Sequence, residues 1–139
     1  LGADSQLEDM AAVGRCSAFI TRRNATRLLH LDLCTGATRE TVDFGAFADA
    51  DGIPDLGTMA LNRGRLFVQV RRYNEDAPAR FAPPAYLAVV DIASEQLVDV
   101  DPALPGVQAI ELAGTSPKHR MQVVDGIRRL YVVLAHPGQ

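Results

Sequence analysis

The stretch Tyr86-Leu-Ala-Val-Val-Asp-Ile92, followed by the turn Ala93-Ser94-Glu95 and the apolar run Gln96–Val100, decides the fold. Both runs are rich in apolar and β-branched residues and have strand length, which favours strands over helices. A short turn between two such runs predicts a β-hairpin. Because Ala88-Val89-Val90 places apolar side chains on both faces of the strand, the predicted sheet must be covered on both sides.

Similar runs recur along the whole chain. Further strands are predicted at Cys16–Thr21, Arg27–Leu33, Thr38–Phe44, Arg65–Arg71, Met121–Val124 and Arg129–Leu134. The last two flank Asp125-Gly126, a dipeptide that strongly favours a hairpin. The best helix candidate is Asp4–Val13, where Leu7, Met10 and Ala11 follow helical spacing. The pattern therefore predicts an all-β protein with at most one short helix at its beginning.

The strands form an internal repeat. Ser17–Arg23 aligns on Leu66–Arg72, and Leu31–Leu33 aligns on Val90–Ile92, with the longer Tyr73–Ala85 loop accounting for the different offsets. Units of about 40–50 residues with about four short strands are typical of β-propeller blades, which must stack because one blade cannot cover its own apolar faces. We expect a partial β-propeller of about two to three blades. The alternative is a β-sandwich in which the repeat-like spacing of the strands is a coincidence.

The repeat predicts the organisation of the chain. We expect residues 1–13 to be an N-terminal extension or the end of a preceding blade, and residues 14–139 to form blades. The expected repeats lie near 15–57, 58–116 and 117–139, the last being incomplete. A propeller needs about four to eight blades. We therefore expect a fragment of a longer protein, with the remaining blades as its immediate partners.

The stretch at residues 86–98, with which the strand prediction began, also resembles a known group of proteins. Residues 86–98, YLAVVDIASEQLV, resemble the "YVAVIDTATDTVV" element of YVTN/YncE-like β-propellers, WD40-like repeats of the quinoprotein-dehydrogenase-like superfamily. Arg15–Arg22, Phe47–Pro54 and Ile110–Pro117 look closer still to propeller lipoproteins and surface proteins of myxobacteria and related proteobacteria. The resemblance covers about residues 14–134. It implies export to the periplasm or cell surface, an optional lipid anchor outside this chain, and no established enzymatic activity.

Composition excludes several classes of function. The chain has 139 residues, is 47% hydrophobic and carries a net charge of −3, with its arginines dispersed along the sequence. Nucleic-acid binding requires clustered Lys and Arg, so we expect no such partner. No apolar run reaches the length of about 18 residues that a transmembrane helix needs. No cofactor is expected, because no ligands of the quinoprotein dehydrogenases can be matched here.

The only two cysteines, Cys16 and Cys34, are predicted to form a disulfide. The hairpin between them is centred near Ala25, so antiparallel pairing places the two cysteines opposite each other, within the usual Cα separation of a disulfide. The alternatives are two buried free thiols, or a register shifted by one residue that separates them. A disulfide would fit an oxidising, exported compartment.

Two loops carry candidate ligand residues. Arg71, Arg72, Tyr73 and Arg80 surround a Pro-rich loop, and Arg and Tyr are typical anchors of interfaces, so this loop could bind a protein or a polysaccharide. Asp49, Asp51 and Asp55 resemble a short calcium loop, but Pro54 interrupts the pattern and no Glu completes it. We expect calcium binding there to be weak or absent, and an acidic turn explains the aspartates equally well.

No catalytic residues are predicted. His30, His119 and His136 lack metal-ligand spacing, and no nucleophile elbow or phosphate-binding loop is present. The leading hypothesis is a non-enzymatic, exported β-propeller segment that serves as a binding or scaffold module at the bacterial envelope. The alternative is part of a propeller enzyme, quinoprotein-like or lyase-like, with His30 and Asp32, or Asp91, facing a central channel. A third is a purely structural repeat array.

Overall fold

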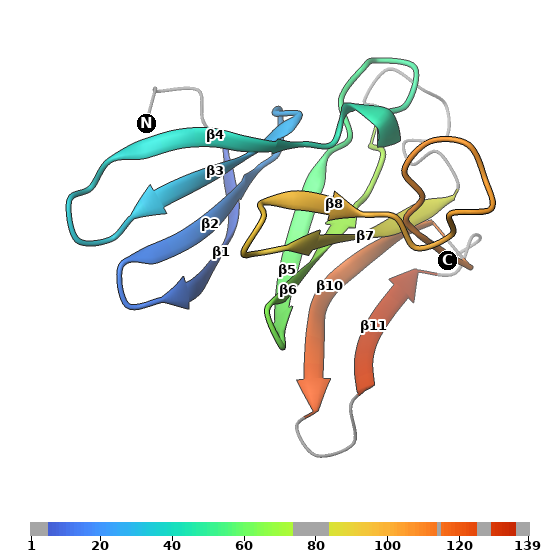
Figure 1. Cartoon of the computed structure of the whole chain (residues 1–139). Coiled ribbons are helices and arrows are strands. Elements are labelled where there is room, and N and C mark those ends of the chain that lie inside the picture. The colour runs from blue at the N-terminus through green and yellow to red at the C-terminus, as the bar shows by residue number, and fades with distance from the viewer. Residues whose placement is uncertain (1–5, 74–83, 114, 125–128, 136–139) are drawn as a thin grey trace.

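The chain folds entirely into β-structure, apart from one turn of 3-10 helix. The computed structural model describes residues 6–73, 84–113, 115–124 and 129–135 (Figure 1). The first sheet is antiparallel and has its four strands in chain order: β1 (Leu7–Gly14), β2 (Ser17–Arg22), β3 (Arg27–Asp32) and β4 (Thr38–Asp43). The short helix η1 (Gly45–Phe47) follows it.

A second antiparallel sheet repeats this arrangement. Its strands β5 (Leu56–Asn62), β6 (Arg65–Val70), β7 (Ala85–Asp91) and β8 (Gln96–Val98) again lie in chain order. The fifth strand, β9 (Ile110–Leu112), pairs with the beginning of β7, whereas β8 pairs with its end. A two-stranded antiparallel hairpin, β10 (Thr115–Val124) and β11 (Arg129–Ala135), completes the described chain.

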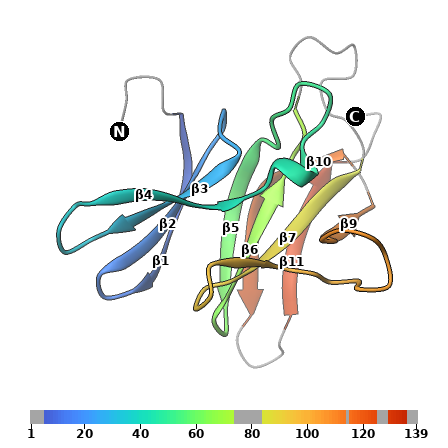
Figure 2. The same cartoon turned by 45° about the horizontal axis from the view of Figure 1, so that its top comes forward.

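The three sheets lie side by side. Figure 1 shows the first sheet on the left and the second in the centre, and the turned view of Figure 2 shows the β10–β11 hairpin against the second sheet. The strand β5 contacts both β1 and β10, so the first strands of the three sheets are neighbours. The all-β expectation is confirmed.

The expected helix at Asp4–Val13 is wrong, because its described part is strand β1. From Asp9 to Gly14 exposure alternates residue by residue, and the inward-facing Ala11 and Val13 pack against the core. That is a period of two, the period of a strand. Residues 1–13 were expected to lie outside the first repeat, yet β1 pairs with β2 over most of its length and belongs to the first sheet.

One apolar core joins the first two sheets. Its fully buried side chains come from strands of both sheets and from the segment between them; they include Phe19, Leu28, Phe44, Leu56, Leu66, Val68, Val70 and Val90. Each such side chain contributes about 1.5–3 kcal/mol by leaving water. The two sheets are therefore held as one unit by the faces they present to each other.

An irregularity in β5 is satisfied by side chains of the first sheet. The pairing of β5 with β6 shifts register between Leu56 and Met59. The freed carbonyl of Gly57 accepts a hydrogen bond from the hydroxyl of Thr21, at 2.8 Å, and the Met59 N–H donates to a carboxylate oxygen of Asp9, at 2.7 Å. Buried backbone groups need such partners, so these two side chains fix how β5 sits against β1 and β2.

The aligned segments occupy the same places in the two sheets. Ser17–Arg23 and Leu66–Arg72 cover the second strands, β2 and β6. Asp32 and Asp91 each end a third strand, and each side chain accepts a backbone N–H from the following turn. The sheets themselves span residues 7–43 and 56–112, so each begins earlier than the expected repeat boundaries near 15 and 58.

The disulfide between Cys16 and Cys34 is confirmed, with the Cα atoms 5.1 Å apart. The expected register is wrong by one residue, because Ala18 pairs with Leu31, and the paired positions sum to 49 instead of 50. The turn between the strands has four residues, 23–26, so the hairpin is centred between Asn24 and Ala25. The cysteines therefore lie just beyond the ladder, where Asp32 accepts the Cys34 N–H at 2.8 Å and bends the chain back towards Cys16.

We expect the double substitution Cys16→Ser, Cys34→Ser to lower the free energy of unfolding by about 3 kcal/mol, because the bridge restricts the unfolded chain. Urea unfolding of the variant and of the wild-type protein measures this difference. Wild-type protein unfolded in the presence of a reductant is the control and should match the variant. A difference below about 1 kcal/mol would contradict the entropic account.

Candidate functional site

Polar residues gather at both ends of the interface between the first two sheets. One group lies where β2 and β6 end and β5 begins, and it lines a pocket. The other lies at the opposite end of the strands, where β3 ends and the β7–β8 turn reaches the first sheet. The two groups differ in character, since the first encloses a cavity and the second is a closed network of contacts.

The first pocket has a volume of about 240 Å³ and is lined by Arg23, Asp55, Arg71 and Tyr73. Asp55 is only 3% exposed and holds the end of β6 in place. Its carboxylate accepts the N–H of Tyr73 at 2.9 Å, and its carbonyl accepts the N–H of Arg71 at 3.1 Å. Asp55 thus fixes the backbone from which the side chains of Arg71 and Tyr73 project.

Burial raises the pKa of Asp55 to about 6. The hydrogen bond from Tyr73 and the charge of Arg71 act against this shift, while the nearby charges of Asp51 and Asp49 add to it. A carboxyl group taken out of water favours its neutral form. Asp55 therefore changes its charge in the mildly acidic range.

Glu8 connects the two arginines of the pocket across the sheets. Its Oε1 pairs with Nη2 of Arg71, at the end of β6, and lies 3.7 Å from Nη2 of Arg23, just after β2. Gly57 lets the Arg71 side chain cross β5, because a Cβ at that position would lie 3.2 Å from Arg71 Nε. A side chain at position 57 would also crowd Gln69 Oε1, at 3.1 Å, so close approach favours glycine there.

A second pocket has a volume of about 320 Å³. It is lined by Arg72, Tyr86, the η1 segment 46–48 and the loop 105–109. The guanidinium of Arg72 lies over the ring of Tyr86, 5.7 Å from its centroid, and Phe47 packs against the same ring at 5.9 Å. A cation over an aromatic face is favourable and keeps the arginine extended.

Three of the four predicted loop residues thus line pockets. Arg71 and Tyr73 line the first pocket and Arg72 lines the second, and Arg72 has a left-handed backbone conformation with φ 52°. Arg80 lies outside the described residues. Glu8 and Arg23 come from β1 and from the turn after β2, and no local sequence pattern pointed to them.

The three aspartates of the suggested calcium loop have separate roles in the structure. Asp49 accepts the N–H of Asp51 at 3.2 Å, and Asp51 accepts the N–H of Ile53 at 2.8 Å, as side chains do in polar turns. Asp55 is turned towards Tyr73. Within the described residues, no group of three or more His, Cys, Asp or Glu side chains is arranged to hold a metal ion.

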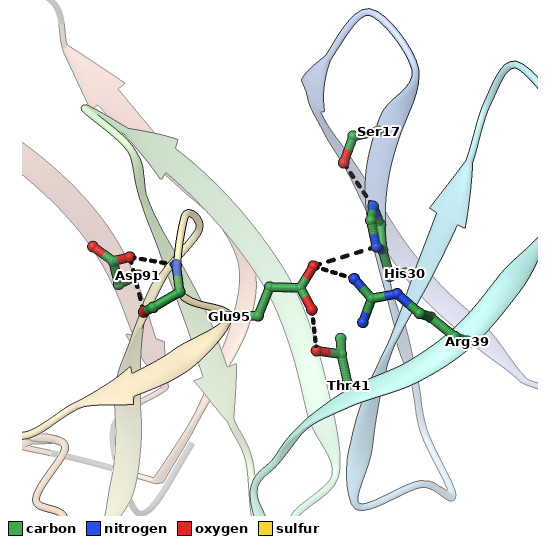
Figure 3. A network of polar contacts seen from close by, with 7 residues as sticks. Ser17, His30, Arg39, Thr41, Asp91 and Glu95 are labelled. Carbon is green, nitrogen blue, oxygen red and sulfur yellow. Dashed lines mark hydrogen bonds and ion pairs between the residues drawn. The ribbon is translucent and has the colours of Figure 1, made fainter.

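The second polar group centres on Glu95 (Figure 3). Its Oε1 accepts from Arg39 and lies 3.3 Å from His30 Nδ1, and its Oε2 accepts from the hydroxyl of Thr41 at 2.7 Å. The other ring nitrogen of His30 lies 2.7 Å from Ser17 Oγ. Glu95, in the turn between β7 and β8, therefore contacts side chains from two strands of the first sheet, β3 and β4, and His30 extends the network to Ser17 on β2.

Glu95 has a backbone conformation that is unusual for its residue type. Its φ is 53°, in the left-handed region, and the equivalent position in the first sheet, four residues after the turn aspartate, is Gly36, with φ 77°. A residue with a Cβ pays roughly 1–2 kcal/mol there. The hydrogen bonds from Arg39 and Thr41 hold the pKa of Glu95 below its usual value, which shows that they favour its charged form.

The residues named for the enzyme alternative have local partners. Asp32 and Asp91 are at the ends of their strands, and backbone N–H groups of the turns lower the pKa of both. His30 stacks on Phe19, with the ring centroids 5.1 Å apart. His119 is on β10, but its side chain, like His136, lies outside what the structure describes.

Comparison with known proteins adds no relative. No protein family matches the chain, and no curated protein is similar to it. Among the described residues, no helix is long and apolar enough to cross a membrane.

We expect Asp55→Asn to remove a pH dependence of stability. The folded protein binds the Asp55 proton more tightly than the unfolded chain does, so the stability of the wild type falls as the pH rises from about 4 to about 6 and then levels off. Asparagine keeps the acceptor for Tyr73 and tolerates a positive φ. The variant should be more stable at neutral pH by up to about 2 kcal/mol.

Urea unfolding across this pH range measures the effect of the Asp55 substitution. Asp49→Asn is the matched control, because it removes a neighbouring carboxylate whose side chain forms only a turn hydrogen bond. An unchanged slope in Asp55→Asn would show that another group titrates.

We expect Glu95→Gln to destabilise the protein by about 0.5–1 kcal/mol, since the pairs it weakens are partly exposed and screened. The lowered pKa fixes the sign: the contribution of Glu95 is complete above its unfolded pKa and is lost as the pH falls through the folded value. Thermal unfolding measures it. Glu40→Gln is the control, because it breaks a more exposed pair with Arg22 inside one sheet, and it should lower the stability less. An equal loss of stability in both variants would contradict a role of Glu95 in holding the two sheets together.

Proposed function

We propose that the chain is a segment of a non-enzymatic, exported β-propeller that binds a partner through the loops at one end of its sheets. Two antiparallel sheets that each have four strands in chain order, the second with β9 added beside β7, support this architecture, as does the hairpin that follows them. So does the neighbouring position of their first strands, β1, β5 and β10. In a propeller, the first strands of successive blades lie closest to the axis, and each blade packs on the next.

The compartment is proposed on two grounds. The resemblance of residues 86–98 to YVTN/YncE-like repeats implies export to the periplasm or cell surface. The disulfide between Cys16 and Cys34 fits an oxidising compartment, where such bridges persist. Further blades supplied by the full-length protein would cover the sheet surfaces that this segment leaves open.

One observation carries the proposal of a binding role: Arg71, Arg72 and Tyr73, three consecutive residues at the end of β6, line two adjacent pockets. Loops on a rigid β-scaffold are where binding residues usually lie. Arginine and tyrosine bind well because they combine apolar area with hydrogen-bond donors. The proposed partner is a polysaccharide or a protein of the bacterial envelope.

The enzyme alternative rests on a different observation. Ser17, His30 and Glu95 form a hydroxyl–imidazole–carboxylate chain, the order found in nucleophilic hydrolases. Arg39 and Thr41 already occupy the carboxylate, and Phe19 covers the ring of His30. These contacts favour a structural role, in which Glu95 and His30 hold the two sheets together. Labelling of Ser17 by a fluorophosphonate, lost in the Glu95→Gln variant described above, would favour catalysis instead.

We expect the chain to be retained on an array of bacterial envelope polysaccharides, and the double variant Arg71→Gln, Arg72→Gln to lose this retention. Arg27→Gln is the matched control. Arg27 is at the same end of the first sheet and pairs with Asp43, but it lines neither pocket. Circular dichroism checks that the variants fold. Absence of retention, or equal retention by the double variant, would contradict polysaccharide binding at these loops.

A further inference from the structure

Two guanidinium groups from different sheets converge at the first pocket. Arg71 and Arg23 both approach the same oxygen of Glu8. Each guanidinium has five N–H donors, and a single carboxylate cannot accept hydrogen bonds from all of them. Nε of Arg71 is buried close to Gly57, so the donors left for a ligand are the terminal Nη groups of Arg71 and Arg23. The pocket therefore offers unused donors in the planar arrangement that suits a second carboxylate.

The pocket is small and mixed in character. Its volume of about 240 Å³ is below the range of roughly 300–1,000 Å³ that is usual for drug-sized ligands, so it suits a single small ring. Tyr73 contributes an aromatic ring to the lining, and Asp55 contributes a carboxylate. A carboxyl group accepts hydrogen bonds both when it is ionised and when it is neutral, so a hydroxyl group of a ligand can donate to Asp55 in either state.

We propose that this pocket binds one carboxylate-bearing sugar residue, a uronate, of an acidic polysaccharide. The sugar carboxylate pairs with the guanidiniums of Arg23 and Arg71, and a sugar hydroxyl donates to Asp55. A peptide C-terminus has the same carboxylate but no ring hydroxyl for Asp55, so the sugar fits better. This inference rests on the proposed function and specifies its ligand.

Acid strengthens this binding, because protonation of Asp55 changes the charge of the pocket. When Asp55 is ionised, its charge and that of Glu8 offset the two arginines; when it is neutral, one positive charge is left to attract the ligand. The pKa of Asp55, about 6, places this change well above the pKa of a sugar carboxylate. Within the described part of the chain, the charged and titratable groups around Asp55 are Glu8 on β1, Arg23 after β2, Asp49 and Asp51 before β5, and Arg71 and Tyr73 after β6.

Isothermal titration calorimetry with an oligogalacturonate tests the inference, with a neutral galactose oligomer of equal length as the comparison. We expect the oligogalacturonate to bind about tenfold more tightly near pH 5 than near pH 7.5, because one charge is removed at short range. Arg23→Gln should weaken binding about tenfold. Substitution of Arg23 should disturb the fold little, because its side chain is 42% exposed and its Nη2 lies 3.7 Å from the Glu8 oxygen. Arg27→Gln should bind like the wild type, and Asp55→Asn should bind equally at both pH values.

Each other outcome overturns the inference in a recognisable way. Equal binding of the neutral oligomer, lost in Arg23→Gln, would leave the pocket as a binding site but reject the uronate. Retention of other polysaccharides on the array, with no binding of the oligogalacturonate, would reject the uronate and keep the proposed function. A pH dependence that persists in Asp55→Asn would reject the role of Asp55.

Discussion

Neither of the first two sheets can bury its own apolar face, and the packing of these faces against each other is the constraint on which the structure depends. Phe19 and Leu28 from one sheet meet Leu66 and Val68 from the other in a single core. This contact sets the distance between the sheets. It thereby brings Glu8 to Arg71 at one end and Glu95 to His30 at the other, although neither pair is close in sequence.

Features that depend on residues close together along the chain could be predicted from the sequence. Strand positions, hairpins and the disulfide follow from apolar runs, turn residues and two cysteines in one hairpin. The register of that hairpin was off by one because turn length is set by hydrogen bonds, here including the Asp32 side chain, that composition does not reveal. The helix expected at Asp4–Val13 failed because pairing with β2 outweighs weak local periodicity.

The candidate site was predictable only in part, for the same reason. Arg71 and Tyr73 stood out as binding residues within one loop. Arg23 and Glu8 complete their pocket from other strands, and only the packing of the two sheets brings them there. Asp55 was grouped with Asp49 and Asp51 by spacing, whereas its burial and its hydrogen bond to Tyr73 give it a separate role. Burial of a single carboxyl group cannot be read from its neighbours in the chain.

The difference between Gly36 and Glu95 has a consequence for how such a chain can evolve. Both are at the same left-handed turn position, but only Glu95 reaches across to the other sheet, where His30, Arg39 and Thr41 receive it. The units are thus no longer interchangeable. A duplicated or transposed unit carrying glycine there would dock without this contact, and one carrying glutamate before the wrong neighbour would keep its backbone strain unrelieved. The residue at this turn position therefore restricts which unit can follow which along the chain.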